Sequence, residues 1–305
     1  LSSLAVSSEL CCDQRILYKD IIDNSSNNST VFNAVLQNLV DQKFPVNDDM
    51  KEDAATIIKQ IKSAYKSNYG DNYKDSLNQA LTSAGYKNLS EYRQKMIKQI
   101  QYANFLLDYI DDHFDDVFND YYQQCAPKYV SLIKISVSDT SSPTDDETSK
   151  LNEVKELISN TDKSFGDIAQ DYSNDSTSSK KGSLGIVDSK DTSGIANSYG
   201  KDVFNAIEAL SEGQVSDVIT GDNGYYFVKV TSTDKKTLKK ELKKTDIDSP
   251  LLAYDDYLQY VVYNSYKINY KDKDIKKIVQ EVVNKALEER KDGCCSLYFF
   301  WTLEC

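Results

Sequence analysis

Apolar residues recur at helical spacing in both ends of this chain, whereas the segment between them alternates in the manner of β-strands. The helical spacing runs through residues 31–124 and returns in 251–266 and 274–290. Apolar and polar residues alternate in 128–137 and 224–231. This order predicts one helical domain built from both ends of the chain, with an α+β domain inserted into it.

Five segments follow from these patterns. The inserted domain has the order strand, helix, helix, strand, helix, strand, which is typical of a compact α+β fold. In the first helical part, Gly85 is expected to end one helix, and Asn88 with Glu91 has the capping-box spacing that begins the next. The predicted segments are a tail at 1–13, a first helical part at 14–126, the inserted domain at 127–232, a second helical part at 233–290 and a cysteine-rich apolar tail at 291–305.

The charge of the chain excludes one class of partner. Against 36 Lys and Arg stand 48 Asp and Glu, a formal net charge of -12 at pH 7, and this sign repels phosphate backbones. We therefore expect no nucleic-acid partner. The single histidine, His113, cannot supply a metal site or a nucleophile that needs two imidazoles. No spacing of residues indicates a metal or another cofactor.

The cysteines gather at the two ends of the chain. Five of the six stand there: Cys11, Cys12, Cys294, Cys295 and Cys305. Neither doublet has the C-x-x-C spacing of a zinc or redox site. They are either tail residues unrelated to function or partners in a disulfide that joins the tails. Cys11 or Cys12 would also suit a lipid anchor, although Glu9 and Leu10 fit a lipoprotein signal poorly. No apolar stretch reaches the roughly 18 residues that span a bilayer.

The inserted domain carries five short sequence blocks in a fixed order. They read SFGDIA at 164–169, YSNDS at 172–176, KGSLG at 181–185, ALSEGQVS at 209–216 and GYYFVKV at 224–230. With these blocks the domain resembles the parvulin-type peptidyl-prolyl isomerases. The helical ends resemble the chaperone region of PrsA-type foldases, which are extracytoplasmic lipoproteins of Gram-positive bacteria, and more distantly that of SurA-type periplasmic chaperones.

The resemblance implies a small antiparallel sheet surrounded by helices, and a protein that works at the outer face of the cell membrane. Its expected partners are unfolded or newly secreted polypeptides, and a homodimer is left open. The chemistry expected of a parvulin domain is rotation about X-Pro bonds, whose barrier is about 18–20 kcal/mol. Such a site grips the proline ring in an apolar slot and stabilises the twisted amide without a covalent step.

The resemblance also assigns site residues. The two histidines of the family fall at Leu132 and Tyr226, so both are replaced here. Asp175 matches an Asp or Cys of the family and Ser216 matches a hydroxyl position; together with Tyr226 they are the candidate catalytic residues. The substrate-binding positions fall at four residues: Leu132, Leu184, Tyr199 and Val203. Leu132 cannot form side-chain hydrogen bonds, so the polar network of the family is either rebuilt or lost.

Three functions are compatible with these residues. The first is a foldase in which chaperone binding dominates and isomerase activity is weak or absent, because both histidines are replaced. The second is an active prolyl isomerase in which Tyr226, Asp175 and Ser216 rebuild the network, since a hydroxyl both donates and accepts hydrogen bonds. The third is a surface binding protein that uses the same architecture.

Tyrosines of the helical part offer one client-binding surface. Tyr102, Tyr109, Tyr121 and Tyr122 would line a cradle between two helical lobes, with apolar ring faces and polar tips suited to reversible contact. The alternative is that they are ordinary core or surface residues of a chain that contains 22 tyrosines. The basic run at 235–244 is interpreted as a solvated face.

Overall fold

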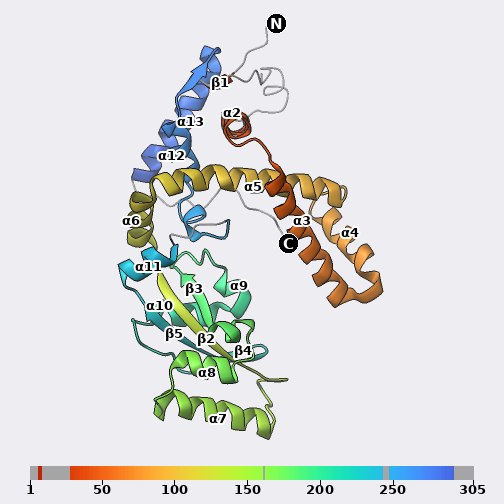
Figure 1. Cartoon of the computed structure of the whole chain (residues 1–305), viewed down its shortest axis with the longest axis vertical. Coiled ribbons are helices and arrows are strands. Elements are labelled where there is room, and N and C mark those ends of the chain that lie inside the picture. Colours follow the sequence, from red (N-terminus) through yellow and green to blue (C-terminus); the bar gives the residue numbers. More distant parts are fainter. Residues whose placement is uncertain (1–5, 9–27, 161, 243–246, 292–305) are drawn as a thin grey trace. The chain divides into compact units, whose positions relative to one another are not determined.

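The computed structural model describes residues 6–8, 28–160, 162–242 and 247–291. These residues form two compact units (Figure 1). The first, which we call the helical unit, contains the described residues up to Asp112 and those from Asp255 onward. The second, which we call the sheet unit, is His113–Tyr254. The predicted architecture, an α+β domain inserted in a discontinuous helical domain, is therefore confirmed.

Aromatic side chains join the two ends of the chain within the helical unit. Phe32 stacks on Tyr260 with ring centroids 4.8 Å apart and meets Tyr263 edge to face at 5.1 Å. Phe105 stacks on Tyr266 at 5.5 Å. Such pairs add about 0.5–1.5 kcal/mol to the burial of the rings themselves. The helices of this unit are α2 (Asn28–Lys43), α3 (Asp48–Tyr69), α4 (Tyr73–Ser83), α5 (Leu89–Asp112), α12 (Leu258–Ser265) and α13 (Lys273–Lys291), with β1 (Val6–Ser8) paired antiparallel to β6 (Ile268–Tyr270).

The turn between α4 and α5 forms as the sequence signals indicate. Gly85 follows the end of α4 with φ +82°, a left-handed conformation that glycine adopts without steric cost. The amide of Tyr86 then donates to the carbonyl of Leu81 at 2.8 Å. The amide of Glu91 donates to the Asn88 side chain at 3.0 Å, which caps the start of α5. Figure 1 shows α3 and α4 side by side next to this turn.

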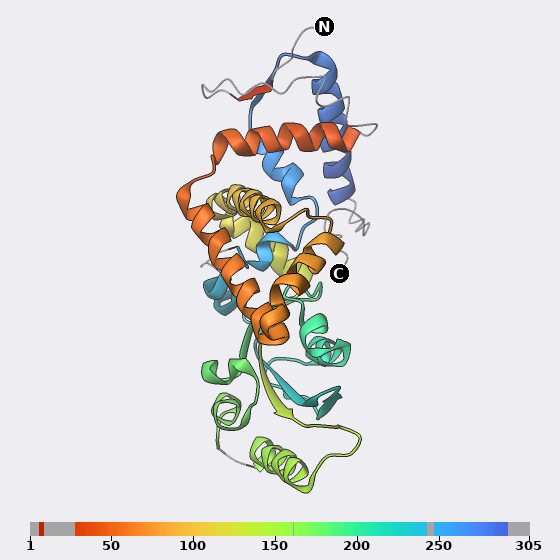
Figure 2. The ribbon, with the colours of Figure 1, turned by 90° about the vertical axis from the view of Figure 1, so that its right-hand side faces the viewer.

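The sheet unit is built on a four-stranded antiparallel sheet with the order β3-β2-β5-β4. Successive side chains of a strand point to opposite sides, so the sheet has two covered faces (Figure 2). The α8 face carries Ile133 and Phe227 and packs on α7 and α8. The α10 face carries Leu132 and Tyr226 and packs on α9 and α10. The elements are α6 (Phe114–Cys125), β2 (Lys128–Ser136), α7 (Asp145–Asn160), α8 (Phe165–Tyr172), β3 (Ser183–Val187), α9 (Ile195–Tyr199), α10 (Lys201–Ala209), β4 (Ile219–Gly221), β5 (Gly224–Ser232) and α11 (Lys235–Leu242).

Gly182, in the KGSLG block, lets the loop after α8 lie directly against β2. A Cβ at this position would be 2.4 Å from the carbonyl oxygen of Leu132 and 2.8 Å from the Cβ of Ala169. The amide of Leu132 donates to the carbonyl of Gly182 at 2.8 Å. Any larger residue would push this loop away from the strand, and the block is thus explained by close approach of two backbones.

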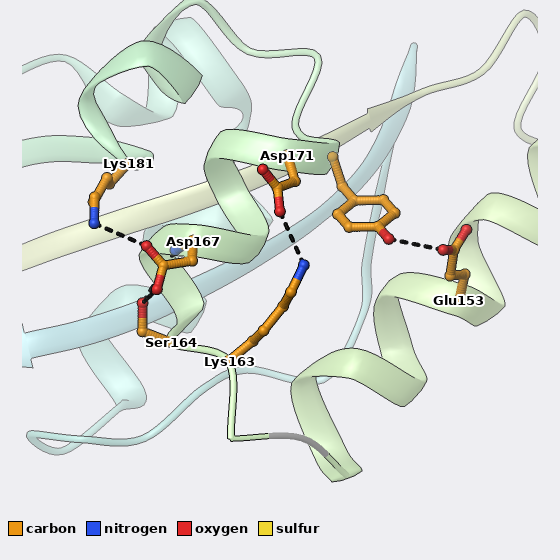
Figure 3. Close-up of polar contacts among 7 residues, drawn as sticks. Glu153, Lys163, Ser164, Asp167, Asp171 and Lys181 are labelled. Atoms are coloured by element: carbon orange, nitrogen blue, oxygen red, sulfur yellow. Dashed lines mark hydrogen bonds and ion pairs between the residues drawn. The ribbon is translucent and has the colours of Figure 1, made fainter.

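Exposed ion pairs fasten the two ends of α8 to the neighbouring loops (Figure 3). Ser164 caps the helix by accepting from the amide of Asp167 at 3.1 Å. The Asp167 carboxylate pairs with Lys181 at 2.8 Å, and Asp171 pairs with Lys163 at 2.9 Å. Because all four charged groups are largely solvated, these pairs add little to stability. The stability of α8 therefore rests on its buried side in the α8 face.

A buried carboxylate ties α6 to the end of β3. Asp188 is fully buried, and its Oδ2 accepts a hydrogen bond from the Tyr121 hydroxyl at 2.9 Å and another from the Thr192 hydroxyl. Its Oδ1 accepts from the amides of Lys190 and Thr192 at 3.0 and 3.3 Å. Burial and the nearby carboxylate raise the pKa of Tyr121. The expectation that Tyr121 lines a client cradle is wrong, because its side chain is used inside the sheet unit.

Two further tyrosines predicted for the cradle, and the basic run, are also explained by packing. Tyr102 is half-buried and donates to Gln259 at 3.1 Å, and Tyr122 is half-buried and donates to the carbonyl of Thr233 at 3.0 Å. The described part of the basic run, residues 235–242, forms α11, in which Leu238 and Leu242 are buried. The interpretation as a solvated face holds for the exposed Lys235, Lys236 and Lys240, whereas the half-buried Lys239 pairs with Asp115 at 2.8 Å.

Several predictions fall on residues outside the described part of the chain. They concern the two tails and their cysteines: Cys11, Cys12, Cys294, Cys295 and Cys305. Their pairing and lipidation stay predictions. Cys125, the remaining cysteine, is buried in α6. Among the described helices, none combines the length and the apolar character needed to cross a membrane.

Candidate functional site

The α10 face brings together five of the seven residues predicted for the site. Leu132, Val203 and Tyr226 are buried in one hydrophobic cluster, and the half-buried Leu184 and Tyr199 pack against it. The cluster joins side chains from strands β2, β3 and β5 and from helices α9 and α10. Residues that are up to 94 positions apart in the sequence, from Leu132 to Tyr226, thus share one surface of the sheet.

Leu132 supplies only apolar surface to this cluster. Its side chain is fully buried, and the register places it opposite Val228 of β5. Its one polar contribution is the backbone amide that bonds to Gly182. A polar network therefore cannot pass through position 132, where the parvulin family has a histidine.

Tyr226 points its hydroxyl toward the turn between β4 and β5. The hydroxyl donates to the Asn223 side chain at 3.0 Å, and the residue as a whole is 4% exposed. This orientation depends on Gly221, because a Cβ there would come within 2.6 Å of Cε2 of the tyrosine ring. The ring also meets Tyr199 edge to face, with centroids 6.2 Å apart. Tyr226 thus closes one end of the apolar cluster.

Asp175 and Tyr199 form a hydroxyl and carboxylate pair at the edge of the cluster. The Tyr199 hydroxyl donates to Oδ1 of Asp175 at 3.4 Å. The same oxygen accepts from the amide and hydroxyl of Thr177 at 2.9 and 2.7 Å, which caps the short helix at Ser176–Lys180. Burial, then the Asp175 carboxylate, raises the pKa of Tyr199 to about 12. Tyr199 is therefore a neutral donor at physiological pH.

Ser216 holds the outer edge of β5. Its hydroxyl accepts from the amide of Val228 at 3.1 Å, and its own amide donates to the Val228 carbonyl at 2.9 Å. The three predicted catalytic side chains thus have separate partners: Asn223 for Tyr226, Thr177 and Tyr199 for Asp175, and Val228 for Ser216.

Three residues of this face were not predicted from the sequence. Asn223 fixes the Tyr226 hydroxyl, Gly221 makes room for its ring, and Lys134 lies with its ammonium 5.7 Å from the ring centroid. The Asp-Asn-Gly turn at 222–224 was the available signal for the first two, since it marks a hairpin that ends at the site strand. For Lys134 the available signal was strand alternation, because a residue two positions after Leu132 lies on the same face of the sheet.

The described residues contain no group of three or more His, Cys, Asp or Glu side chains arranged to hold a metal ion. The polar groups beside the apolar centre of the α10 face include the Tyr199 and Tyr226 hydroxyls, the Asp175 carboxylate, the Asn223 amide and the Lys134 ammonium.

Comparison with known proteins gives one family match. Residues 132–232 match the family described as Rotamase, PPIC-type PPIASE domain. The matched segment begins at Leu132 and ends with β5, so it contains both faces of the sheet.

Sequence relatives extend beyond this segment. The chain is 32% identical over 151 residues to the foldase protein PrsA of Staphylococcus aureus (strain bovine RF122 / ET3-1), which covers 47% of this chain and 44% of that protein. It is 32% identical over 141 residues to the foldase protein PrsA of Staphylococcus epidermidis (strain ATCC 12228 / FDA PCI 1200). This match covers 44% of this chain and 41% of that protein. The matched stretch thus spans less than half the length of either relative.

Among solved structures, PrsA from Bacillus subtilis aligns with 89% of this chain and 97% of its own, with 20% identity and a TM-score of 0.41. The foldase protein PrsA from Streptococcus pneumoniae aligns with 90% of this chain and 99% of its own, with 18% identity and a TM-score of 0.41.

Proposed function

We propose that this chain, whose residues 132–232 form a PPIC-type peptidyl-prolyl isomerase domain, is a PrsA-like foldase that binds unfolded or newly secreted polypeptides outside the cytoplasm. Chaperone binding dominates, and isomerase activity is weak or absent. Similarity to PrsA foldases over 151 residues supports the foldase. A lipid anchor at Cys11 or Cys12 belongs to the same proposal.

The proposal of weak isomerase activity rests on Leu132 and Tyr226, which stand at the two histidine positions of the family. Catalysis of X-Pro rotation requires groups that bind the twisted amide better than the planar one. Leu132 has no polar atom to offer, and the Tyr226 hydroxyl is already bonded to Asn223. The apolar cluster around them keeps the means to hold a proline ring without those polar groups.

The helical unit supports the chaperone part of the proposal. Helix α3 has 22 residues, of which only Met50, Ala54 and Ile58 are buried. Near its end, Tyr69 is 53% exposed and stacks on Tyr65 with ring centroids 5.5 Å apart. Exposed aromatic rings with polar tips suit weak, reversible contact with unfolded chains.

A second candidate is an active isomerase with a rebuilt polar site. Its support is the hydrogen bond between Tyr199 and Asp175, which sets a hydroxyl and a carboxylate beside the Tyr226 ring. In this case Tyr226 would have to leave Asn223 and bond to the substrate amide.

The test measures isomerisation of a short X-Pro peptide and suppression of aggregation of an unfolded protein that has no slow proline step. The comparison is between Tyr226→Phe and Tyr225→Phe. Tyr225 is the matched control, because it is the neighbouring tyrosine, points to the α8 face, and donates to the carbonyl of Thr140 at 3.3 Å.

The proposal expects protection from aggregation in all three proteins and a peptide rate close to the uncatalysed one. A fast rate that Tyr226→Phe abolishes and Tyr225→Phe preserves would establish the second candidate in its place. If the unmodified chain did not suppress aggregation of the unfolded protein, the chaperone role would be contradicted.

A further inference from the structure

Lys134 places a positive charge on the α10 face. It follows Leu132 by two positions in β2, so its side chain points to the same side of the sheet. The register sets it opposite Tyr226, and its ammonium lies 5.7 Å from the centroid of that ring. The side chain is half-buried. An ammonium over an aromatic face is held there by attraction to the ring electrons.

The backbone of Lys134 is fixed to the loop that carries Asp175. Its amide donates to the Ser173 hydroxyl at 3.0 Å, and its carbonyl accepts from the amide of Asn174 at 2.8 Å. The Asp175 carboxylate is engaged by Thr177 and Tyr199. The strand, the loop and the lysine stem therefore form one supported edge of the face.

The ammonium of Lys134 has no carboxylate within ion-pair distance in the described part of the chain. The contact that positions it is the Tyr226 ring. A charge held in place beside an apolar cluster, with no internal counter-ion, is available to an anionic group of a ligand. The partial burial strengthens such a contact relative to one between fully solvated charges.

We propose that Lys134 makes the α10 face prefer proline segments that carry a carboxylate, from Asp or Glu, on a residue next to the proline. This inference rests on the proposed function, because it assumes that the apolar cluster holds the proline ring. The net charge of -12 repels acidic segments at long range, so the preference acts at contact distance. Salt weakens both effects, since the screening length is about 8 Å at physiological ionic strength.

The test is an NMR titration of the full chain with short peptides in which Glu, Gln or Lys directly precedes or directly follows a single proline. The variants are Lys134→Met, which keeps the stem over the Tyr226 ring, and Lys134→Arg, which keeps the charge. Lys229→Met is the matched control, because Lys229 is a half-buried lysine on the neighbouring strand, opposite Ser131 in the register.

We expect a Glu peptide to bind about three- to ten-fold more tightly than its Gln counterpart. The preference should vanish in Lys134→Met, persist in Lys134→Arg and Lys229→Met, and shrink at high salt. Equal binding of the Glu and Gln peptides, or a preference that survives Lys134→Met, would overturn this inference alone. Failure of every proline peptide to bind would overturn the proline site of the proposed function together with it.

Discussion

The two faces of the sheet differ in what their side chains do, although they share the same strands. On the α8 face, Ile133 and Phe227 pack on apolar residues of α7 and α8. On the α10 face, Leu132 and Tyr226 pack with a second tyrosine, a lysine lies over the Tyr226 ring, and a carboxylate bonds at the edge. Because side chains alternate along a strand, both faces bury apolar side chains, but the α10 face also carries this group of polar side chains.

Two adjacent tyrosines summarise this difference. Tyr225 belongs to the α8 face and its hydroxyl bonds to a backbone carbonyl of Thr140, outside the cluster. Tyr226 lies in the α10 cluster and bonds to the Asn223 side chain. The comparison teaches that substitutions one position apart should separate stability from binding.

The largest effect is expected for Ile133→Ala. Removing a fully buried isoleucine from the α8 face should lower the free energy of unfolding of the sheet unit by about 2–5 kcal/mol, without changing peptide binding by the folded fraction. Hydrogen exchange of the β2 and β5 amides in the full chain measures this unit separately. Leu132→Ala should lower both stability and binding. If Ile133→Ala also weakened binding by folded protein, the two faces would not act independently.

The next effect is expected for Gly221→Ala. The new methyl group would come within 2.6 Å of the Tyr226 ring, so the ring must move and the Asn223 bond must break, at a cost of about 1–3 kcal/mol. In a Tyr226→Leu background the same change should cost much less, which a double-mutant cycle measures. Thr220→Ala, at an exposed position of β4, is the control. Additive costs would show that Gly221 does not position the ring.

A smaller effect is expected for Glu147→Gln on α7. The Glu147 carboxylate accepts hydrogen bonds from the amides of Thr144 and Ser138, and these lower its pKa from 4.5 to about 2. Since the folded state favours the ionised form, the contribution is present above about pH 4.5 and is lost as the pH falls toward 2.

The difference in stability between Glu147→Gln and the unmodified chain should therefore shrink as the pH falls through that window. Acid unfolding followed by circular dichroism measures it, with the exposed Glu156→Gln of the same helix as control. A difference that stays constant with pH would show that the ionised carboxylate is not the cause.

The smallest effect is expected for Asp175→Asn on the α10 face. The Asp175 carboxylate contributes to the rise in the pKa of Tyr199 to about 12, so the amide should bring this pKa closer to 10. Because the folded state favours the neutral phenol, its contribution to stability is present below pH 10 and is lost as the pH rises toward 12. Carbon-13 NMR of labelled tyrosine rings follows the titration, and an unchanged Tyr199 pKa would contradict the pairing.

Much of this architecture was predictable because it follows simple periodicity. Strand alternation predicted β2 and β5, and helical spacing predicted α7, α8 and α10. The family resemblance led to five residues that share the α10 cluster, and two of them, Leu184 and Tyr226, lie in the ordered blocks. Periodicity is reliable where elements are long enough to repeat it.

The rest depends on contacts that no local pattern encodes. Strand β4 has three residues and α9 has five, too few to display a period. Gly221 and Asn223, in the hairpin before β5, decide the direction of the Tyr226 hydroxyl. The Tyr121 hydroxyl is held inside the sheet unit by Asp188, 67 positions away in the sequence. Such choices arise only when distant segments meet.

The buried Asp188 decides where the sheet unit can be cut from the chain. The family match begins at Leu132, but a fragment trimmed to that point loses Tyr121 and leaves a buried carboxylate short of a donor. It also removes the ring of Tyr121 from Tyr254, with centroids now 5.4 Å apart. An independently folding piece must therefore include both Tyr121 and Tyr254, as the sheet unit His113–Tyr254 does, and limited proteolysis should release a piece of that length before any shorter one.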